Sequence, residues 1–330
     1  MLNIFSKLVF FLLIFSSMTN AQLVPIDERE LSNAIGQAFI NIDHSSDVNN
    51  SLDFTKITFG LDIKTSLNAD LLELGKYDVA GKAAGSADIK ITDFALGHID
   101  ESGSIVPFEI ADPFIELAFD NDSVTGKQNL AGVRVGFGGA LGKLSGNIEY
   151  LTGNIDIGIR GLGKSIYDKA NTGQDILLWF AGVSDNSVLT AEAELVNKDT
   201  GLSDPFRAQH VGMVNGQNLS CVENCGPFSF LLDLDFTSSQ GCGVLGIDTC
   251  FPLTNFKSLD IGNNGQKSEG LFVSFQTKNI AWKDGSNSTT ASRGAFINIP
   301  NGGITVNFDQ AFNGIPRSRT RYLDPYFGGR

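Results

Sequence analysis

The sequence has few charged residues, few histidines and no catalytic motif. Charged residues make up 18% of the chain, and 37 acids outnumber 24 bases for a formal net charge of −13. A chain with this negative charge repels phosphate backbones, and we therefore expect no nucleic acid partner. The histidines His44, His98 and His210 lie far apart, and neither H-E-x-x-H nor G-x-S-x-G occurs. The usual marks of zinc and serine hydrolases are therefore missing, and we assign no catalytic residue, cofactor or metal ligand.

Beyond the N-terminus the sequence also lacks the run of about 20 apolar residues that a transmembrane helix needs. At the N-terminus, Lys7 precedes the apolar run Leu8–Phe15, and small and polar residues follow up to Ala21. This pattern predicts a secretory signal peptide over residues 1–21, with a retained N-terminal anchor as the alternative. We expect an exported protein of the periplasm, the outer-membrane surface or the extracellular space.

Glycine and phenylalanine, by contrast, are abundant, with 37 and 25 residues respectively. Over much of the chain apolar residues alternate with polar ones, which is the period of a strand with one buried face. Glycine, asparagine and aspartate separate the runs, as is typical of turns. The alternating runs are Ile57–Leu71, Ala87–Ile91, Phe114–Phe119, Val133–Phe137, Ile148–Ile159, Phe228–Phe236, Leu271–Phe275, Phe296–Ile304 and Val306–Phe308.

Many strands with polar connections predict an all-β fold, mainly antiparallel, in the form of a sandwich or an open barrel. A β-solenoid is an alternative, although its only local repeat is LSGNIEY against LTGNIDI. An outer-membrane barrel is another alternative, for which the few tyrosines and tryptophans would make thin aromatic girdles. We expect one β-rich body over residues 46–330, with a cysteine-containing insertion at about 215–255.

A short amphipathic helix is predicted before this body. Leu31, Ile35 and Phe39 follow at helical spacing, and Asp27 and Glu28 stand near the start, where acids suit the helix dipole. We expect the helix and its lead-in within residues 22–45. The helix either ends near residue 36 or continues into a strand at residues 38–42.

The four cysteines lie close together as Cys221-x3-Cys225 and Cys242-x7-Cys250. Behind a signal peptide, an even number of clustered cysteines predicts disulfides, although spacing alone leaves three connectivities open. A zinc site with thiolate ligands is the alternative, but the spacing lacks paired C-x2-C knuckles. We expect disulfides that staple the insertion.

The stretch GIRGLGKS, from Gly158 to Ser165, matches the letter pattern of a phosphate-binding loop. A working loop of this kind follows a buried strand of a parallel sheet and opens a helix. Here the preceding GNIDI alternates like its neighbours. We therefore expect no nucleotide ligand, and a turn after a strand with Lys164 and Ser165 facing solvent.

Paired carboxylates give two further hypotheses. Glu192 with Glu194, and Asp233 with Asp235, put two acids on one strand face about 7 Å apart, near the separations that glycoside hydrolases use. A solvent-facing strand predicts the same pattern. The turn at Asp120–Ser123 clusters oxygen ligands that could hold calcium, but it lacks the spaced acids of a dedicated loop.

Arginines alternate in the C-terminal tail PRSRTRYLDPYFGGR. Arg317, Arg319 and Arg321 either solvate the chain end, pair with the acidic body, or form a docking peptide for a partner protein.

Three segments carry a resemblance: VPIDERELSNAIGQA, ADPFIELAFDNDSVTGKQNLAGVRVGFGGALGKLSG and GAFINIPNGGITVNFDQAFNGIPRSRTR. They resemble the secreted Fil-type putative pilus-system proteins of Gram-negative bacteria. The resemblance leaves out the cysteine segment and carries over no catalytic residue. It implies an exported envelope or surface protein tied to pilus or fimbrial assembly.

Together these observations favour a non-catalytic structural or interaction protein of the cell envelope or surface, whose partners are other envelope or pilus proteins. Exposed sheet edges could accept strands from such partners. The alternatives are a secreted β-sandwich that binds a glycan, a lipid or calcium, and a glycoside hydrolase.

Overall fold

The structure is a computed structural model, and it describes residues 39–47, 50–121, 127–170, 175, 178–179, 182–213, 219–227, 242–244, 247–284 and 287–320. In chain order the strands up to the middle of the chain are β1 (Ile40–Asp47), β2 (Leu52–Phe59), β3 (Asp62–Thr65), β4 (Leu67–Lys76), β5 (Ala87–Leu96), β6 (His98–Ile99), β7 (Ile105–Val106), β8 (Phe108–Asn121), β9 (Gln128–Tyr150) and β10 (Gly153–Leu162).

A short helix α3 (Lys164–Tyr167) follows β10, and α5 (Phe308–Asn313) follows the last strand. The elements between them are β11 (Val188–Val196), β12 (His210–Gly212), β13 (Ser220–Glu223), β14 (Gly243–Val244), β15 (Ile247–Asp248), β16 (Cys250–Pro252), the 3-10 helix η3 (Leu253–Asn255), β17 (Ser258–Ile261), β18 (Phe272–Gln276), β19 (Ile280–Asp284), β20 (Asn287–Ala291) and β21 (Gly294–Val306).

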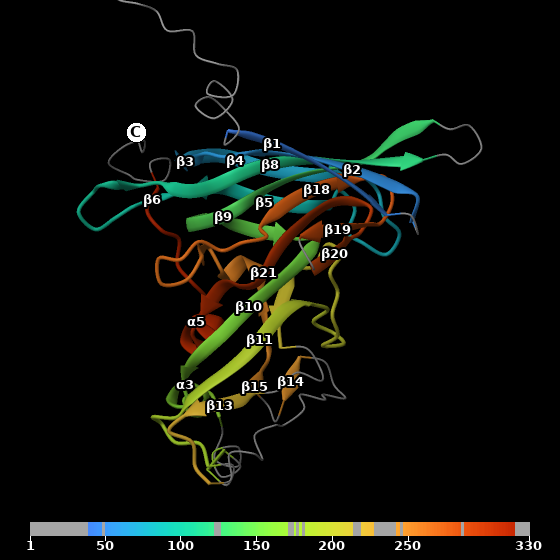
Figure 1. Ribbon diagram of the computed structural model, residues 1–330. Helices are drawn as coiled ribbons and strands as arrows, with labels where there is room; N and C mark the ends of the chain where they lie inside the picture. Colours follow the sequence, from blue (N-terminus) through green and yellow to red (C-terminus); the bar gives the residue numbers. More distant parts are fainter. Residues whose placement is uncertain are drawn as a thin grey trace, which may run out of the picture. The chain divides into compact units, whose positions relative to one another are not determined.

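Most strands belong to one sheet with the order β1-β2-β8-β9-β17-β21-β10-β11-β12-β16. Its longest strand, β9, pairs with β8 and β5 along one edge and with β18 and β17 along the other. Both β17 and β18 also pair with β21, so they lie end to end between β9 and β21. Figure 1 shows β18 and β21 beside β9. These pairs join strands far apart in sequence, which no short repeat could arrange, so the solenoid alternative is wrong.

The prediction of an all-β, mainly antiparallel fold is confirmed. One described pair departs from it, because β10 and β21 run parallel, with Gly153 opposite Ile297 and Ile159 opposite Val306. No helix in the described part of the chain is long and apolar enough to cross a membrane.

Several predicted boundaries are corrected. The single strand expected over Ile57–Leu71 is wrong, because the chain breaks at Gly60 and its residues divide among β2, β3 and β4. Leu52 and Phe54 are the buried side chains of β2, so the buried face has the opposite parity to the predicted one. Phe308 begins helix α5 rather than ending a strand.

Two further predictions lie wholly or partly outside the described residues. Residues 22–38 of the expected N-terminal helix and the run Phe228–Phe236 are not described. The chain enters strand β1 at Ile40, which agrees with the alternative of a strand at residues 38–42.

The apolar interior falls into two clusters of buried residues. The larger one lies among β5, the start of β8, the C-terminal half of β9, β10, β11, β21 and α5, and includes Phe108, Ile148 and Ile159. The smaller one, which we call the hairpin core, contains Leu52, Phe54, Ala118, Ala131, Phe272, Ile280, Trp282, Ala291 and Phe296. Ile280, Trp282 and Ala291 come from the β19–β20 hairpin, which therefore covers one face of the β2–β8–β9–β18 sheet.

A fully buried arginine ties this hairpin to the sheet. Arg134 of β9 donates from Nε to Glu116 of β8 at 2.7 Å, from Nη1 to Asp284 of β19 at 2.8 Å, and from Nη2 to the Lys283 carbonyl at 2.9 Å. Its guanidinium also lies 5.3 Å from the ring of Trp282. Two carboxylates and a carbonyl thus satisfy the buried cation, which an apolar surrounding would otherwise make costly.

A second buried arginine crosslinks distant segments around the larger cluster. Arg207 donates from Nε to Asp88 at 2.9 Å and from Nη1 to the Ser86 hydroxyl at 2.9 Å. The other Asp88 oxygen accepts from the Ala295 amide at 2.9 Å. A Cβ on Gly294, whose φ is +105°, would lie 2.3 Å from that carboxylate oxygen, so only glycine fits there.

We predict that Arg134→Met lowers the free energy of unfolding by about 3–5 kcal/mol, because it leaves the carboxylate of Glu116 buried without its cation. Denaturant unfolding of the purified protein measures the change. The matched control is Arg160→Met, which removes the ion pair of an exposed arginine with Glu223 and should cost less than about 1 kcal/mol. Equal losses for the two variants would contradict the structural role of Arg134.

Candidate interaction surface

The sheet face opposite the hairpin core carries apolar side chains in rows that run across the strands. Register places Ile42, Ile57, Ile115, Val135 and Val273 side by side on β1, β2, β8, β9 and β18. A flanking row contains Thr55, Leu117, Val133 and Phe275, and the pairs Ile40–Phe59 and Pro113–Phe137 extend the surface on the other side. We call these residues together the apolar face.

Large apolar groups on this face remain open to solvent. Ile42 is 55% exposed, Ile115 and Val135 are 40% exposed, and Phe275 is 42% exposed. Single exposed apolar residues are ordinary, but a contiguous set on neighbouring strands marks an interaction surface. Sequence reasoning missed this face, because it assigned one buried face to each alternating strand.

Charged groups stand only at the margin of the apolar face. The carboxylate of Asp53 accepts from the Ser46 hydroxyl at 2.6 Å and from the Asn121 amide at 2.7 Å. These hydrogen bonds, that of Ser46 first, lower the pKa of Asp53. His44 shares the margin, with Nδ1 3.1 Å from the Thr55 hydroxyl. In a chain of net charge −13, the centre of this face is therefore unusually free of charge.

Strand β1 forms one edge of the sheet. It pairs with β2 on one side, and no strand of the described part of the chain pairs with its other side. Seven of its eight residues are exposed, and its sequence INIDHSSD contains neither proline nor lysine, the residues that commonly protect an edge. The apolar face and the open β1 edge are continuous, because Ile40 and Ile42 belong to both.

The four predicted disulfide cysteines are paired locally. Cys221 is bonded to Cys225 with a Cα–Cα distance of 5.9 Å, and Cys242 to Cys250 with a distance of 5.2 Å. Each bridge closes a short loop, so neither joins the two ends of the segment at 215–255. Thiols that are paired in this way hold no zinc.

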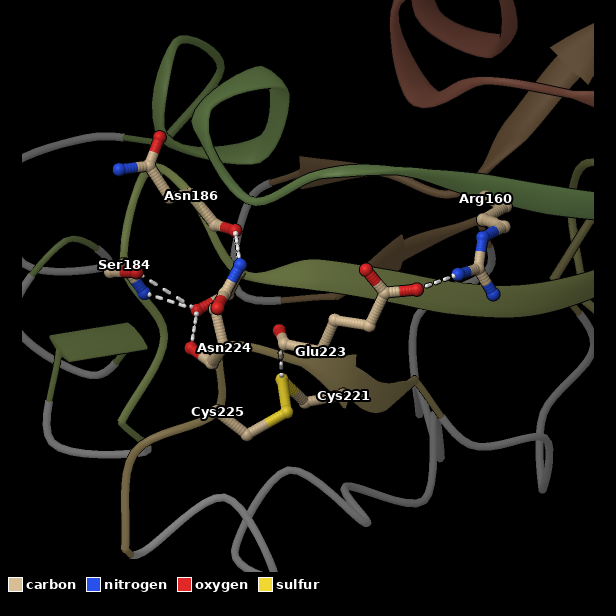
Figure 2. Close-up of a disulfide and its surroundings, with 8 residues drawn as sticks. Arg160, Ser184, Asn186, Cys221, Glu223, Asn224 and Cys225 are labelled. Atoms are coloured by element: carbon tan, nitrogen blue, oxygen red, sulfur yellow. Dashed lines mark hydrogen bonds and ion pairs between the residues drawn. A yellow bond between two sulfur atoms is a disulfide. The ribbon is translucent and has the colours of Figure 1, made fainter.

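Figure 2 shows the bridge between Cys221 and Cys225 next to Ser184 and Asn186, which belong to the segment before strand β11. Cys221 lies on β13, which pairs with β11 at Leu189. Next to the bridge, the Asn224 side chain donates to the Asn186 carbonyl at 3.1 Å, and the Asn224 carbonyl accepts from Ser187 at 2.9 Å. The bridge therefore anchors a loop to the end of the sheet.

The proposed docking arginines of the tail are held differently from one another. Arg317 is half-buried and donates to the Asp93 carbonyl, and burial lowers its pKa. The carbonyl of Arg319 accepts from the Ile99 amide at 2.8 Å, and Arg321 lies outside the described residues. The tail up to residue 320 thus packs on β5 and β6.

The structure describes one of the two acidic pairs, and it places this pair on strand β11. Glu192 and Glu194 alternate with the buried Ala191, Ala193 and Leu195, so they lie on the outward face of β11. Burial raises the pKa of Glu194, as it does that of Asp156 on β10. Asp233 and Asp235 lie outside the described residues.

The residues of the possible calcium turn and of the phosphate-loop pattern lie in strands, in a short helix and in ion pairs where the structure describes them. Asp120 forms an ion pair with Lys278 at 2.9 Å, and Asp122 and Ser123 lie outside the described residues. Gly158–Leu162 belong to strand β10 rather than to a loop, and the exposed Lys164 pairs with Asp168 at 2.8 Å.

The histidines stand on three different strands, β1, β6 and β12. Burial lowers the pKa of both His98 and His210. Within the described ranges, no group of three or more histidine, cysteine, aspartate or glutamate side chains could hold a metal ion.

Comparison of the chain with protein-family models, with curated proteins and with solved structures found no match.

We predict that peptide mapping without reductant recovers the pairs Cys221–Cys225 and Cys242–Cys250. Replacing Cys221 and Cys225 together by serine should lower the free energy of unfolding by about 2 kcal/mol, because a short closed loop restricts the unfolded chain only modestly. Four free thiols, or crosslinks between the two pairs, would show that the assigned pairing is wrong.

Proposed function

We propose that this chain is an exported, non-catalytic structural or interaction protein of the cell envelope or surface, serving a pilus system. It acts through the apolar face and the adjoining β1 edge, which bind other envelope or pilus proteins. The observation that carries this proposal is the contiguous exposure of Ile42, Ile115, Val135 and Phe275 on neighbouring strands.

Leaving such an apolar surface in contact with water costs free energy. Burying apolar area contributes about 25 cal/mol per Å², so a partner that covers several half-exposed isoleucine, valine and phenylalanine side chains gains several kcal/mol. The apolar rows run across five neighbouring strands, and a protein surface of similar size suits them.

The export part of the proposal is supported by independent features. The N-terminal sequence has the pattern of a signal peptide, and both described cysteine pairs are disulfides, which persist in oxidising compartments. The pilus assignment is supported by the sequence resemblance to the Fil-type proteins. The middle block of this resemblance covers most of β8 and most of β9, two strands of the apolar face.

We predict that Ile115→Lys is exported and folds normally but loses its association with the envelope. The substituted side chain is 40% exposed, so the melting temperature should change little, whereas a desolvated charge at the centre of the interface opposes binding. The measurement is the fraction of protein that sediments with washed envelopes or sheared surface appendages. A fall of about tenfold corresponds to about 1.4 kcal/mol of lost binding.

The matched control is Leu202→Lys, which puts the same charge on a leucine that is 53% exposed and lies outside the apolar face. This variant should distribute like the natural chain. If Ile115→Lys also distributes like the natural chain, the apolar face is not the binding surface. Recovery of the natural chain in the cytoplasm with its N-terminus uncleaved would contradict export.

A further inference from the structure

Backbone groups on the open side of β1 are available for another strand. In an antiparallel pair, alternate residues direct their N–H and C=O groups toward the partner and away from it. The Gly60 amide donates to the Phe39 carbonyl at 2.9 Å, so the odd-numbered residues of β1 bond to β2. Ile40, Ile42, His44 and Ser46 therefore present their backbone groups at the free edge.

A row of alternating charge ends at this edge. Asp43 on β1 lies opposite Lys56 on β2, Lys56 lies opposite Glu116 on β8, and Glu116 lies opposite Arg134 on β9. These residues share the sheet face that points away from the apolar face. Read from the sheet interior outward, the signs are plus, minus, plus and minus.

The inner members of this row are balanced by their contacts. Arg134 is bonded to Glu116 and Asp284, and Lys56 lies 3.9 Å from Asp284, so two cations meet two carboxylates. Asp43 is exposed, accepts from the Asn41 amide at 2.7 Å, and makes no ion pair with any described residue. The outermost position of the row is thus an acid that lacks a cation.

On the other face, the apolar rows also reach the edge. Ile42 ends the row Ile42–Ile57–Ile115–Val135, and His44 ends the row that continues with Thr55 and Leu117. An added strand would therefore place an apolar side chain beside Ile42, a basic one beside Asp43, and an apolar or β-branched one beside His44. Cross-strand pairs of these kinds stabilise antiparallel sheets.

We propose that β1 accepts one extended strand from a partner polypeptide, whose core reads apolar–basic–apolar with the basic residue opposite Asp43. This inference rests on the proposed function and specifies the partner segment. A second copy of this chain is a poor occupant, because β1 has no lysine or arginine to place opposite Asp43 and the chain carries a net charge of −13.

The test uses the purified chain and two labelled heptapeptides in fluorescence anisotropy. The probe is acetyl-Thr-Thr-Val-Arg-Ile-Thr-Val-amide, and its partner has glutamate in place of arginine. We expect the arginine peptide to bind about tenfold more tightly, because it exchanges a repulsive cross-strand pair for an attractive one. Asp43→Lys should reverse this order, and Asp43→Asn should bring the two affinities close together.

A backbone test complements the charge swap. Ile42→Pro removes an N–H that faces the open edge and leaves the β1–β2 hydrogen bonds in place, so both peptides should bind at least about tenfold more weakly. Circular dichroism and the melting curve show whether this variant is folded. If Ile42→Pro does not fold, the comparison of the two peptides on Asp43→Lys and Asp43→Asn tests strand addition without it.

Three results would overturn the inference: no binding of the arginine peptide, equal binding of both peptides that Asp43→Lys leaves unchanged, or a dimer of the purified chain that Ile42→Pro dissociates. Each is separable from the proposed function. Loss of envelope association in Ile115→Lys, together with any of these results, would keep the apolar face as the binding surface and reject strand addition.

Discussion

The ion-pair cluster at Arg134 is the interaction on which the arrangement of the sheet depends. It joins β8, β9 and the β19–β20 hairpin through Glu116, Asp284 and the Lys283 carbonyl, so the hairpin is held over one face only. That face gains a closed core around Trp282. On the opposite face, Phe137 and Val273 pack against the larger cluster, whereas Ile42, Ile115, Val135 and Phe275 stay in contact with water. The buried cation therefore fixes the side of the sheet on which the hairpin core forms.

The same cluster is the inner end of the row of alternating charge that reaches edge strand β1. A buried arginine requires acids on the strands beside it, and Lys56 stands next to those acids on β2. The alternation passes outward until it reaches Asp43, the exposed end of the row. The apolar rows reach the same strand on its other face, at Ile42. Charge on one face and apolar surface on the other together describe the segment that would complete the sheet.

The sequence was sufficient for the fold class, because period-two alternation and glycine-rich turns are local signals. It failed at Ile57–Leu71, since both faces of β2 carry apolar residues and alternation alone cannot say which face is covered. The capping box of Asn307 and Gln310 marked helix α5, but the alternation up to Phe308 concealed it. The apolar face and the charged row could not be predicted, because they join residues of β1, β2, β8, β9 and β18 through register. The Glu192–Glu194 pair and the phosphate-loop pattern were visible in the sequence, and the structure adds only their positions on strands β11 and β10.

Hydrogen exchange of the chain in isolated envelopes, compared with the purified chain, measures whether the β1 edge is covered by a partner. We expect the edge amides of Ile40, Ile42, His44 and Ser46 to exchange rapidly in the purified chain and to become protected in envelopes. Peptides from β10 and β11, far from this surface in the strand order, should exchange alike in both samples. Equal exchange of β1 in the two samples would contradict binding of a partner at this edge, because backbone groups that bond to a partner strand exchange more slowly.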